Sequence, residues 1–259
     1  MPEGHNRLPQ PVAEARRRAI PEPLVIPPQH FYRTAALPCP SIPGQVERKL
    51  ITELAGHEAM TFYNALSRAG FRRSHHLAYR PDCGHCTACV PVRIPAAEFS
   101  PSRSLRRILK SNADLAVRVV RPQATLEQFR LFVRYQRSRH ADSDMASMTF
   151  GDFRAMIEDS PVTSRLIELR NGSGAFLGAC LVDLLDDGLS AVYSFFEPEE
   201  RRRSLGTFLV LALVEAALQR SLPYAYLGYW IAESRKMAYK ARFRPLEALT
   251  REGWHRLSL

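Results

Sequence analysis

Three cysteines spaced three residues apart form the first group of side chains in this sequence that could bind a ligand. Cys83, Cys86 and Cys89 lie in the stretch YRPDCGHCTACVPVRI, and Cys39 in LPCPSIPG could supply a fourth thiolate. Four thiolates are the ligand set of many structural zinc sites and iron–sulfur clusters. Zinc ribbons normally use two separated pairs, however, and three ligands this close together strain a tetrahedron. We therefore favour free thiols and keep a metal at these four cysteines as the alternative.

A second group combines cations with aromatic rings near the C-terminus. It lies in YLGYWIAESRKMAYKARFRPLE. Tyr229 and Trp230 end an expected strand, and cations and a further ring follow at a spacing of one helical turn: Arg235, Lys236, Tyr239 and Lys240. Such a row suits the end of a nucleotide chain, because bases stack on rings and phosphates pair with ammonium and guanidinium groups. The alternative is an amphipathic helix whose basic face is merely solvated.

The remaining patterns give no support to several classes of enzyme. Asp142 and Asp144 in RHADSDMAS could act as paired carboxylates, but Asp-Ser-Asp ahead of a helix is also a capping signal, which we favour. The sequence contains no Walker A loop, no HExxH zinc motif and no Ser/His/Asp series in a hydrolase order. Nucleoside triphosphatases and hydrolases therefore have no motif here.

The charge of the chain predicts a polyanionic partner. The 259 residues carry a formal net charge of +10, and the pI is about 9.7. Residues 100–121 contain six Lys or Arg and one acidic residue, and residues 201–259 contain eleven Lys or Arg and four acidic residues. Residues 142–200, between these two blocks, contain three Arg and twelve acidic residues. Two basic blocks that fold together can form one positive face. A generally Arg-rich, solvated surface is the alternative.

Hydropathy and cysteine usage predict a soluble, cytoplasmic protein with two domains. No apolar run reaches the roughly 18 residues that span a bilayer, so no membrane contact is expected. Residues 1–30 lack the apolar stretch of a secretory signal, and we expect a flexible lead-in. Five cysteines in a reducing cytosol do not suggest disulfides. We expect a smaller Cys-containing domain over residues 31–101 and a second domain over residues 102–259.

Periodicity predicts the elements that position these groups. In the first domain it indicates one helix over residues 57–69 and short strands in LAYR and VPVRI. In SPSRSLRRILKSNADL, cations at i, i+3, i+4 and i+7 share one face of a helix, opposite Leu105, Ile108 and Leu109. These cations are Arg103, Arg106, Arg107 and Lys110.

The second domain is predicted to be a mixed α/β (α+β) fold. A strand at 117–120, helices at 126–139 and 150–158, and a three-stranded meander with the turns NGSG and DDG precede a long helix, the strand YAYLGYW and a final basic helix around SRKMAYKARF. This order resembles the N-acetyltransferase-like (GNAT) fold, whose loop before the long helix binds a pyrophosphate through backbone N–H groups. Residues 203–207 match the Arg-x-x-Gly start of that loop. Phe208 stands where a coenzyme A binder has Gly or Ala, so we expect an anion other than coenzyme A.

Several long motifs resemble the aminoacyl-tRNA-protein transferases, in particular the short bacterial aspartate/glutamate leucyltransferases, which resemble eukaryotic arginyltransferases. In order from about residue 30 to the end, they are PCPSIPGQVERKL, GFRRSHHLAYRPDCGHCTACVPVRIPAAEFSPSRSLRRILKSN, RYQRSRHADSDM, SAVYSFFEPEERRRSLGTFLV and YAYLGYWIAESRKMAYKARFRPLE. The resemblance implies transfer of leucine from leucyl-tRNA onto proteins that begin with Asp or Glu, which marks them for N-degron proteolysis. Eukaryotic relatives resemble iron–sulfur or haem binders through adjacent cysteines, a spacing not found here, and we expect no required cofactor.

The implied reaction joins an activated ester to an α-amine. An α-amine with a pKa of about 7.7–8.0 keeps a usable neutral fraction near pH 7, so a dedicated strong base is hardly required. We expect the protein to orient both ends, stabilise the oxyanion and move one proton to the leaving ribose oxygen. The candidates for this work are polar groups at the expected cleft: Tyr193, Ser204, Tyr229 and Lys236.

Binding roles follow from the same resemblance. An acidic acceptor needs a cation, best a guanidinium fork, and Arg80 and Arg93, which bracket the cysteines, are expected to form this anion-binding floor. The tRNA is expected to contact Arg103, Arg106, Arg107, Lys110, Arg203, Gly206, Trp230, Arg235 and Lys240. Three alternatives remain open: a coenzyme A-dependent acetyltransferase, a metal-stabilised nucleic-acid-binding module without enzymatic activity, and an arginyl rather than leucyl donor.

Overall fold

The structure, a computed structural model, describes residues 29–139, 141 and 143–258. The predicted lead-in lies almost wholly outside this range, and so does Asp142. Asp144 begins the short helix η2 (Asp144–Ser147), where the Ser143 hydroxyl accepts a hydrogen bond from the Met145 amide. Within the described part of the chain, no helix is both long enough and apolar enough to cross a bilayer.

The N-terminal part forms a small sheet covered by one helix. The strands are β1 (Tyr32–Arg33), β4 (Lys49–Glu53), β5 (Arg72–Ser74) and β6 (Leu77–Pro81), in the order β1-β4-β6-β5, and β2 (Leu37–Pro38) pairs separately with β3 (Val46–Glu47). Helix α1 (Ala59–Arg68) packs its buried residues Tyr63 and Leu66 into the core under this sheet. The helix predicted over residues 57–69 is therefore confirmed.

The rest of the chain builds one large sheet. Its strands are β7 (Val90–Pro95), β8 (Ala116–Val120), β9 (Ser164–Arg170), β10 (Phe176–Leu184), β11 (Gly188–Phe196), β12 (Tyr224–Trp230), β13 (Glu247–Thr250) and β14 (Gly253–Arg256). They lie in the order β14-β13-β7-β12-β11-β10-β9-β8. The predicted meander corresponds to the antiparallel run β9, β10 and β11. Strand β7 precedes residue 101, yet it lies inside this sheet, between β12 and β13.

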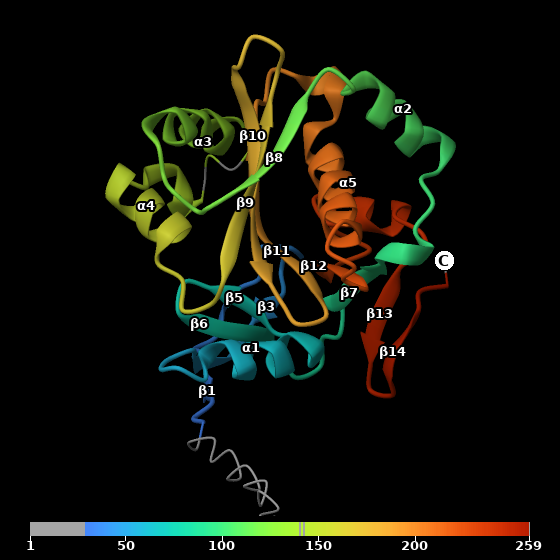
Figure 1. Ribbon diagram of the computed structural model, residues 1–259. Coiled ribbons are helices and arrows are strands. Elements are labelled where there is room, and N and C mark those ends of the chain that lie inside the picture. The colour runs from blue at the N-terminus through green and yellow to red at the C-terminus, as the bar shows by residue number, and fades with distance from the viewer. Residues whose placement is uncertain (1–28, 140, 142, 259) are drawn as a thin grey trace, which may run out of the picture.

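Helices cover both faces of the large sheet (Figure 1). On one face lie α3 (Leu126–Arg139) and α4 (Phe150–Glu158), whose aromatic residues pack with those of β10 and β11. On the other lies α5 (Leu205–Leu218), most of whose residues are buried, with α2 (Arg103–Ser111) beside it. A helix that is apolar all round fits such a central place, because every side of it meets other elements.

Local sequence signals account for several of these boundaries. Helix α4 starts with a capping box, in which the Thr149 hydroxyl and the Asp152 carboxylate each accept a hydrogen bond from the other residue's backbone N–H. The turn between β9 and β10 is held by the Asn171 side chain, which accepts hydrogen bonds from the Ser173 and Ala175 amides. Both signals are readable in the sequence, and both elements lie where it predicts them.

Strands β11 and β12 separate after a short parallel contact. Their pairing covers only residues 188–190 against 224–226, although both strands continue beyond it. The other strand pairs described in this sheet are antiparallel. The meander, the long helix that follows it and the separating strands make up the predicted mixed α/β, N-acetyltransferase-like arrangement.

The final basic helix is the element that the sequence predicts wrongly. Residues 238–242 form only the short 3-10 helix η4 (Ala238–Arg242), and the chain becomes extended at Phe243. The spacing of Lys236 and Lys240 looks helical, but Lys240 is buried and donates a hydrogen bond to the Tyr229 carbonyl. The position of this lysine is set by the tertiary contact and not by a solvated helix face.

Candidate active site

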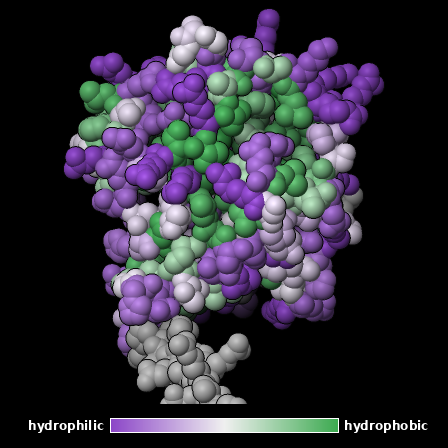
Figure 2. All heavy atoms as spheres, viewed as in Figure 1, coloured by the Kyte–Doolittle hydropathy of each residue, from purple (hydrophilic) through white to green (hydrophobic). Residues whose placement is uncertain are grey.

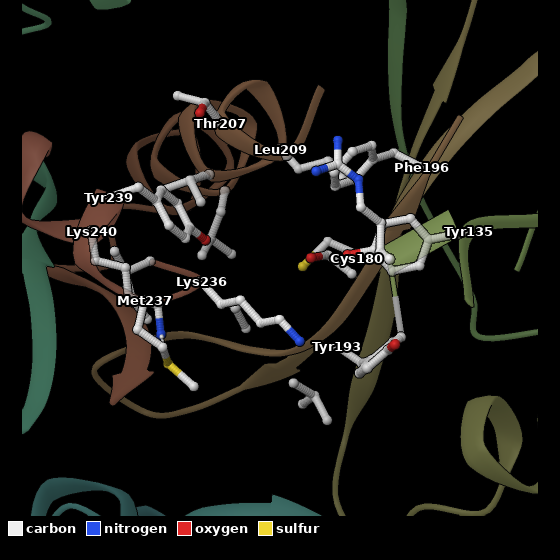
Figure 3. Close-up of a pocket in the computed structure, with 18 of the residues that line it drawn as sticks. Tyr135, Cys180, Tyr193, Phe196, Thr207, Leu209, Lys236, Met237, Tyr239 and Lys240 are labelled. Carbon is white, nitrogen blue, oxygen red and sulfur yellow. Dashed lines mark hydrogen bonds between the residues drawn. The ribbon is translucent and has the colours of Figure 1, made fainter. Parts of the chain in front are cut away.

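A cavity of about 630 Å³ lies where β11 and β12 separate. This volume is in the range of sites for small molecules and cofactors. Figure 3 shows Tyr135 and Tyr193 on one side, Tyr239 and Lys240 on the other, and Lys236 extending between them. The cavity therefore draws on α3, β11 and the segment around η4, which are far apart in sequence.

The guanidinium group of Arg72 fills the split between the two strands. Its Nη2 donates hydrogen bonds to the carbonyls of Ala191 (2.6 Å) and Val192 (2.9 Å) on β11, and its Nη1 donates to the carbonyl of Leu227 (3.3 Å) on β12. These carbonyls lie just past the last paired residues, so the side chain replaces the missing strand partner. Gly228 makes this possible, because a Cβ there would lie 1.4 Å from Nη1.

The cavity is strongly positive. Among its described lining residues are five cations and no carboxylate or imidazole; the cations are Arg72, Arg139, Arg235, Lys236 and Lys240. Arg139, Arg235 and Lys236 are exposed, whereas Lys240 is buried. A concave site with a single sign of charge concentrates ligands of the opposite sign, so the cavity favours anions.

Part of the wall is apolar. It is contributed by β10, β11, α5, β12 and the segment before η4, and it consists of Cys180, Ala191, Val192, Leu209, Val210, Leu213, Leu227 and Met237. Burial raises the pKa of the Cys180 thiol to about 12, so this group stays protonated and acts as a small apolar side chain. The cavity therefore offers an aliphatic surface beside its cations.

Two of the four predicted catalytic residues, Tyr193 and Lys236, line the cavity. The Tyr193 hydroxyl accepts a hydrogen bond from Gln136 Nε2 at 2.6 Å, so its own proton can be donated elsewhere. Burial raises the pKa of Tyr193, and the nearby Tyr135 raises it further. Tyr193 is therefore a neutral hydrogen-bond donor and not a base.

Lys240 is the buried cation of the cavity. Its side chain is 8% exposed, and Nζ donates to the Tyr229 carbonyl and contacts the Met237 sulfur at 3.6 Å. Burial lowers the pKa of Lys240 to about 7, and the charge of Arg72 lowers it further in the same direction. At neutral pH this amine is thus present in both protonation states.

The other two predicted catalytic residues, Tyr229 and Ser204, do not line the cavity. The Tyr229 hydroxyl is buried and donates to the carbonyls of Gly70 (3.0 Å) and Tyr79 (3.2 Å), which joins β12 to the N-terminal part. Ser204 is exposed, with a left-handed backbone conformation (φ 53°), and makes no side-chain cap at α5. Neither side chain is among the cavity's lining groups.

The predicted anion loop at the start of α5 only partly faces the cavity. Gly206 and Thr207 line it, and a Cβ at Gly206 would lie 2.8 Å from the Phe196 ring, so this close packing needs glycine. Phe208, whose size argued against coenzyme A, is 7% exposed and packs into the core. Trp230 also packs against this core, and it does not line the cavity.

The two predicted acceptor-binding arginines lie outside the cavity. Arg93 is buried, donates to Glu247 Oε2 at 2.8 Å, and stacks on Tyr224 at 3.5 Å from its guanidinium carbon to the ring centre. This cation is already neutralised and enclosed, so it does not offer a fork to a ligand. Arg80 is exposed and lies 5.1 Å from the centre of the Phe71 ring.

The predicted basic row on α2 is present on the surface. Its four cations, Arg103, Arg106, Arg107 and Lys110, are all exposed, and Leu105 on the other side is buried. Leu109, expected to be inside, is 37% exposed. Figure 2 shows this region of the molecule as hydrophilic. Arg203 nearby forms ion pairs with Asp114 and Glu200.

The four N-terminal cysteines are half-buried free thiols. Burial first, and then the neighbouring Cys39, Cys83 and Cys86, raise the pKa of Cys89 to about 11, so this thiol is protonated when no metal is bound. Within the described residues, no group of three or more His, Cys, Asp or Glu side chains is placed to hold a metal ion. Free thiols and a zinc or iron–sulfur site at these four cysteines both stay predictions, which metal analysis of the purified protein tests directly.

Sequence reasoning missed several cavity residues because they come from unrelated segments. Arg72, Arg139 and Tyr135 line the site, yet each lies in a stretch that reads as an ordinary strand or helix. The one local signal is Gly228 within the strand YLGYW, since an isolated glycine in a strand often marks a close backbone approach.

Comparison with known families identifies relatives for both parts of the chain. Residues 37–107 match the model of the N-terminus of arginine-tRNA-protein transferases, and residues 127–250 match that of the C-terminus. The chain is 55% identical over 231 residues to an aspartate/glutamate leucyltransferase of Paramagnetospirillum magneticum, covering 89% of this chain and 95% of that one. It is 53% identical over 228 residues to the protein of the same name from Rhodospirillum rubrum, covering 88% and 93%.

Two of the solved structures that match are distant from this chain. The C-terminal domain of a putative lysylphosphatidylglycerol synthetase from Agrobacterium fabrum has a TM-score of 0.45 at 13% identity, covering 64% of this chain and 61% of that one. L-PGS from Bacillus licheniformis has a TM-score of 0.44 at 10% identity, covering 70% and 52%.

Proposed function

The chain belongs to the arginine-tRNA-protein transferase family, and from this premise we propose that it transfers leucine from leucyl-tRNA to the α-amino group of proteins with Asp or Glu at the N-terminus. The observation that carries the proposal is identity above half, over nearly the whole length, to relatives named aspartate/glutamate leucyltransferases. The chain is thus an aminoacyltransferase whose donor is a charged tRNA and whose acceptor is a protein.

The aliphatic wall of the cavity supports leucine as the transferred residue. A leucyl side chain there would lie against Leu209, Leu213 and Leu227. An arginyl side chain would instead bring another positive charge among five cations, with no carboxylate lining the described cavity to pair with it. Leucine is therefore the donor that this charge pattern favours.

The excess positive charge supports an acidic acceptor. A carboxylate at the first side chain of the acceptor would meet guanidinium and ammonium groups, of which Arg139, Arg235 and Lys236 are exposed at the cavity. Charge-assisted hydrogen bonds of this kind are about twice as strong as neutral ones. An acceptor that begins with Ala would gain none of them, so it should react poorly.

The chemistry needed is aminolysis of an ester. The α-amine attacks the ester carbonyl, and the negative charge that develops on the carbonyl oxygen must be stabilised. Tyr193 is suited to this task, because its hydroxyl proton is not used by its partner Gln136 and its raised pKa keeps that proton in place. Lys236, which extends into the same space, would add a positive charge near the oxyanion.

The tRNA body requires a larger positive surface than the cavity. The exposed cations of α2 supply one, and this helix lies beside α5, whose N-terminal residues Gly206 and Thr207 line the cavity. We assign the acceptor stem to α2 and the terminal adenosine to the cavity mouth.

Transfer assays test the proposal directly. The protein is incubated with tRNAs charged with one labelled amino acid at a time and with peptides that differ only in a first residue of Asp, Glu or Ala. We expect leucine to be added to the Asp and Glu peptides alone. Transfer of arginine but not leucine would overturn the donor assignment, and equal labelling of the Ala peptide would overturn the acceptor assignment. Acetyl-coenzyme A should give no thermal shift.

A further inference from the structure

Aminolysis by a protein N-terminus releases a proton that some group must accept. This proton is released only if the protein catalyses the proposed transfer, so the role inferred below for Lys240 rests on the proposed function. The acceptor enters as an ammonium with three protons and leaves as an amide nitrogen with one. One of the two protons lost goes to the leaving ribose oxygen, and the other remains for a base. Free amine is available near pH 7. A base in the cavity would in addition deprotonate the α-ammonium group of an acceptor whose carboxylate is already bound by the cations of the site.

The described cavity contains few groups that could take this proton. No Asp, Glu or His lines it. Burial raises the pKa of both Cys180 and Tyr239 to about 12, and it also raises the pKa of Tyr193 and of Tyr135. These four groups are therefore neutral acids and cannot start as bases near pH 7. Arginine does not lose its proton in proteins. The lysines remain.

Lys236 and Lys240 differ in their exposure to water, and this difference decides which of them can be a neutral amine. Lys236 is exposed, and water stabilises its charged form. Lys240 is 8% exposed, and no carboxylate among the described lining residues balances its charge. Removing an ammonium from water without a counter-ion favours the neutral amine. Because Lys240 is buried, its amine can be neutral before the reaction begins.

The groups that face Lys240 reinforce this state. Arg72, fixed on the carbonyls of β11 and β12, contributes a permanent positive charge, and Cys89, ahead of β7, acts in the opposite direction with a smaller effect. The Nζ atom of Lys240 also donates hydrogen bonds to the Tyr229 carbonyl and the Met237 sulfur. Both accept hydrogen bonds from the N–H groups of the amine, which leaves its lone pair available.

We propose that the neutral side-chain amine of Lys240 accepts the proton lost by the acceptor's α-ammonium group, and that burial, reinforced by the charge of Arg72, keeps this amine neutral. The N–H bond of the ammonium breaks, its proton binds the Nζ lone pair, and the freed amine attacks the ester carbonyl. A C–N bond forms, the bond from carbon to the ribose oxygen breaks, and that oxygen takes the second proton of the attacking nitrogen. Lys240 then returns its proton to solvent.

The protonation state can be measured without any activity, because the chain has only four lysines: Lys49, Lys110, Lys236 and Lys240. With ¹³C,¹⁵N-labelled lysine, the side-chain NMR signals of the intact protein are followed against pH, and Lys240→Arg assigns the signal that disappears. We expect that signal to titrate near pH 7, where the amine is half protonated. Titration of the Lys240 signal above pH 9 would overturn the proposal.

Single-turnover kinetics test the role. Lys240→Arg introduces a permanent cation that cannot accept a proton, and Lys240→Met removes the amine at similar length. We expect each variant to lower the transfer rate about 10²-fold or more at pH 7. Lys49→Arg, in β4 and away from the cavity, is the matched control and should retain the wild-type rate. Melting temperature and tRNA affinity of each variant separate loss of the amine from loss of the fold.

A modified acceptor separates proton transfer from positioning. When an aminooxy group, neutral at pH 7, replaces the α-ammonium of the Asp peptide, no net proton is released and Lys240 has no proton to take. We expect the defect of Lys240→Arg to shrink to less than about 10-fold with this acceptor, since general-base catalysis is the part that is no longer needed. An equal defect with both acceptors would overturn the proposal. Wild-type protein that transfers no leucine would instead overturn the proposed function, while the lysine titration would still report on Lys240.

Discussion

Individual cations in this protein take their roles from their surroundings and not from their residue type. Arg72 replaces a strand partner, Arg93 is enclosed by rings and Glu247, and Lys240 is buried without a carboxylate. In the sequence these three residues look alike, as basic side chains in a basic chain. The partners of Arg72 and Arg93 lie more than 100 positions away in the sequence, and the burial of Lys240 depends on the tertiary fold, so no local pattern records the difference.

Gly228 provides the test at the residue scale. Gly228→Ala would place a Cβ 1.4 Å from Arg72 Nη1, so the guanidinium group must leave the carbonyls it binds. Gly174→Ala is the control, because Gly174 has a similar backbone (φ 84°, against 71°) with nothing within 4 Å of its Cβ position. We expect the control to cost about 1–2 kcal/mol of unfolding free energy in urea, from the positive φ alone.

The two variants should separate clearly. Gly228→Ala has the same cost of a positive φ, and it also loses several hydrogen bonds from the Arg72 guanidinium group, each worth about 1.5–3 kcal/mol. We expect its transfer activity to fall together with its stability. Equal losses of stability for Gly174→Ala and Gly228→Ala would show that the Arg72 contact contributes nothing.

Secondary-structure elements were predictable where their signals are local. Helices α3 and α4 and strands β9 and β12 have the predicted bounds, because periodicity and capping residues mark them. The final helix was not predictable from its spacing, because a buried lysine at Lys240 looks the same as a solvated one in sequence. Local patterns thus gave the elements, and tertiary burial decided this exception.

Helix α2 gives the prediction at the scale of an element. The double variant Arg103→Gln, Arg107→Gln removes two exposed cations from its row without touching buried Leu105. If each contacts a phosphate, the slope of log affinity for tRNA against log salt should fall by about 1 per contact. Binding is measured by fluorescence anisotropy at several salt concentrations.

The control for α2 lies on the opposite face of the sheet. The variant Arg130→Gln, Arg154→Gln removes two exposed cations from α3 and α4 and makes the same change in net charge. Its salt slope should equal that of the wild type. If both double variants weaken binding equally, net charge and not the α2 surface drives tRNA binding.

The whole molecule is joined by a buried ion pair between its two sheets. Arg73 on β5 and Asp183 on β10 form two hydrogen bonds (2.7 and 2.8 Å), and their side chains are 1% and 0% exposed. Ser164 also donates to this carboxylate. A pair so enclosed should be costly to break, because the remaining charge stays buried.

Asp183→Asn tests this connection. We expect it to lower the unfolding free energy by about 3–5 kcal/mol. Asp186→Asn is the matched control from the turn that follows β10, since Asp186 pairs with Arg68 while both side chains are about half exposed (51% and 44%). It should cost no more than about 1 kcal/mol. Similar losses in urea denaturation would contradict the assigned role of burial.

The position of β7 inside the large sheet affects how the chain can fold during translation. This strand is synthesised early, yet its neighbours β12 and β13 come more than 120 residues later. During translation, the backbone groups of β7 must therefore stay unpaired until residues 224–250 have left the ribosome. Pairings over such distances are slow to form, so the nascent protein should depend on holding factors that shield an incomplete sheet edge.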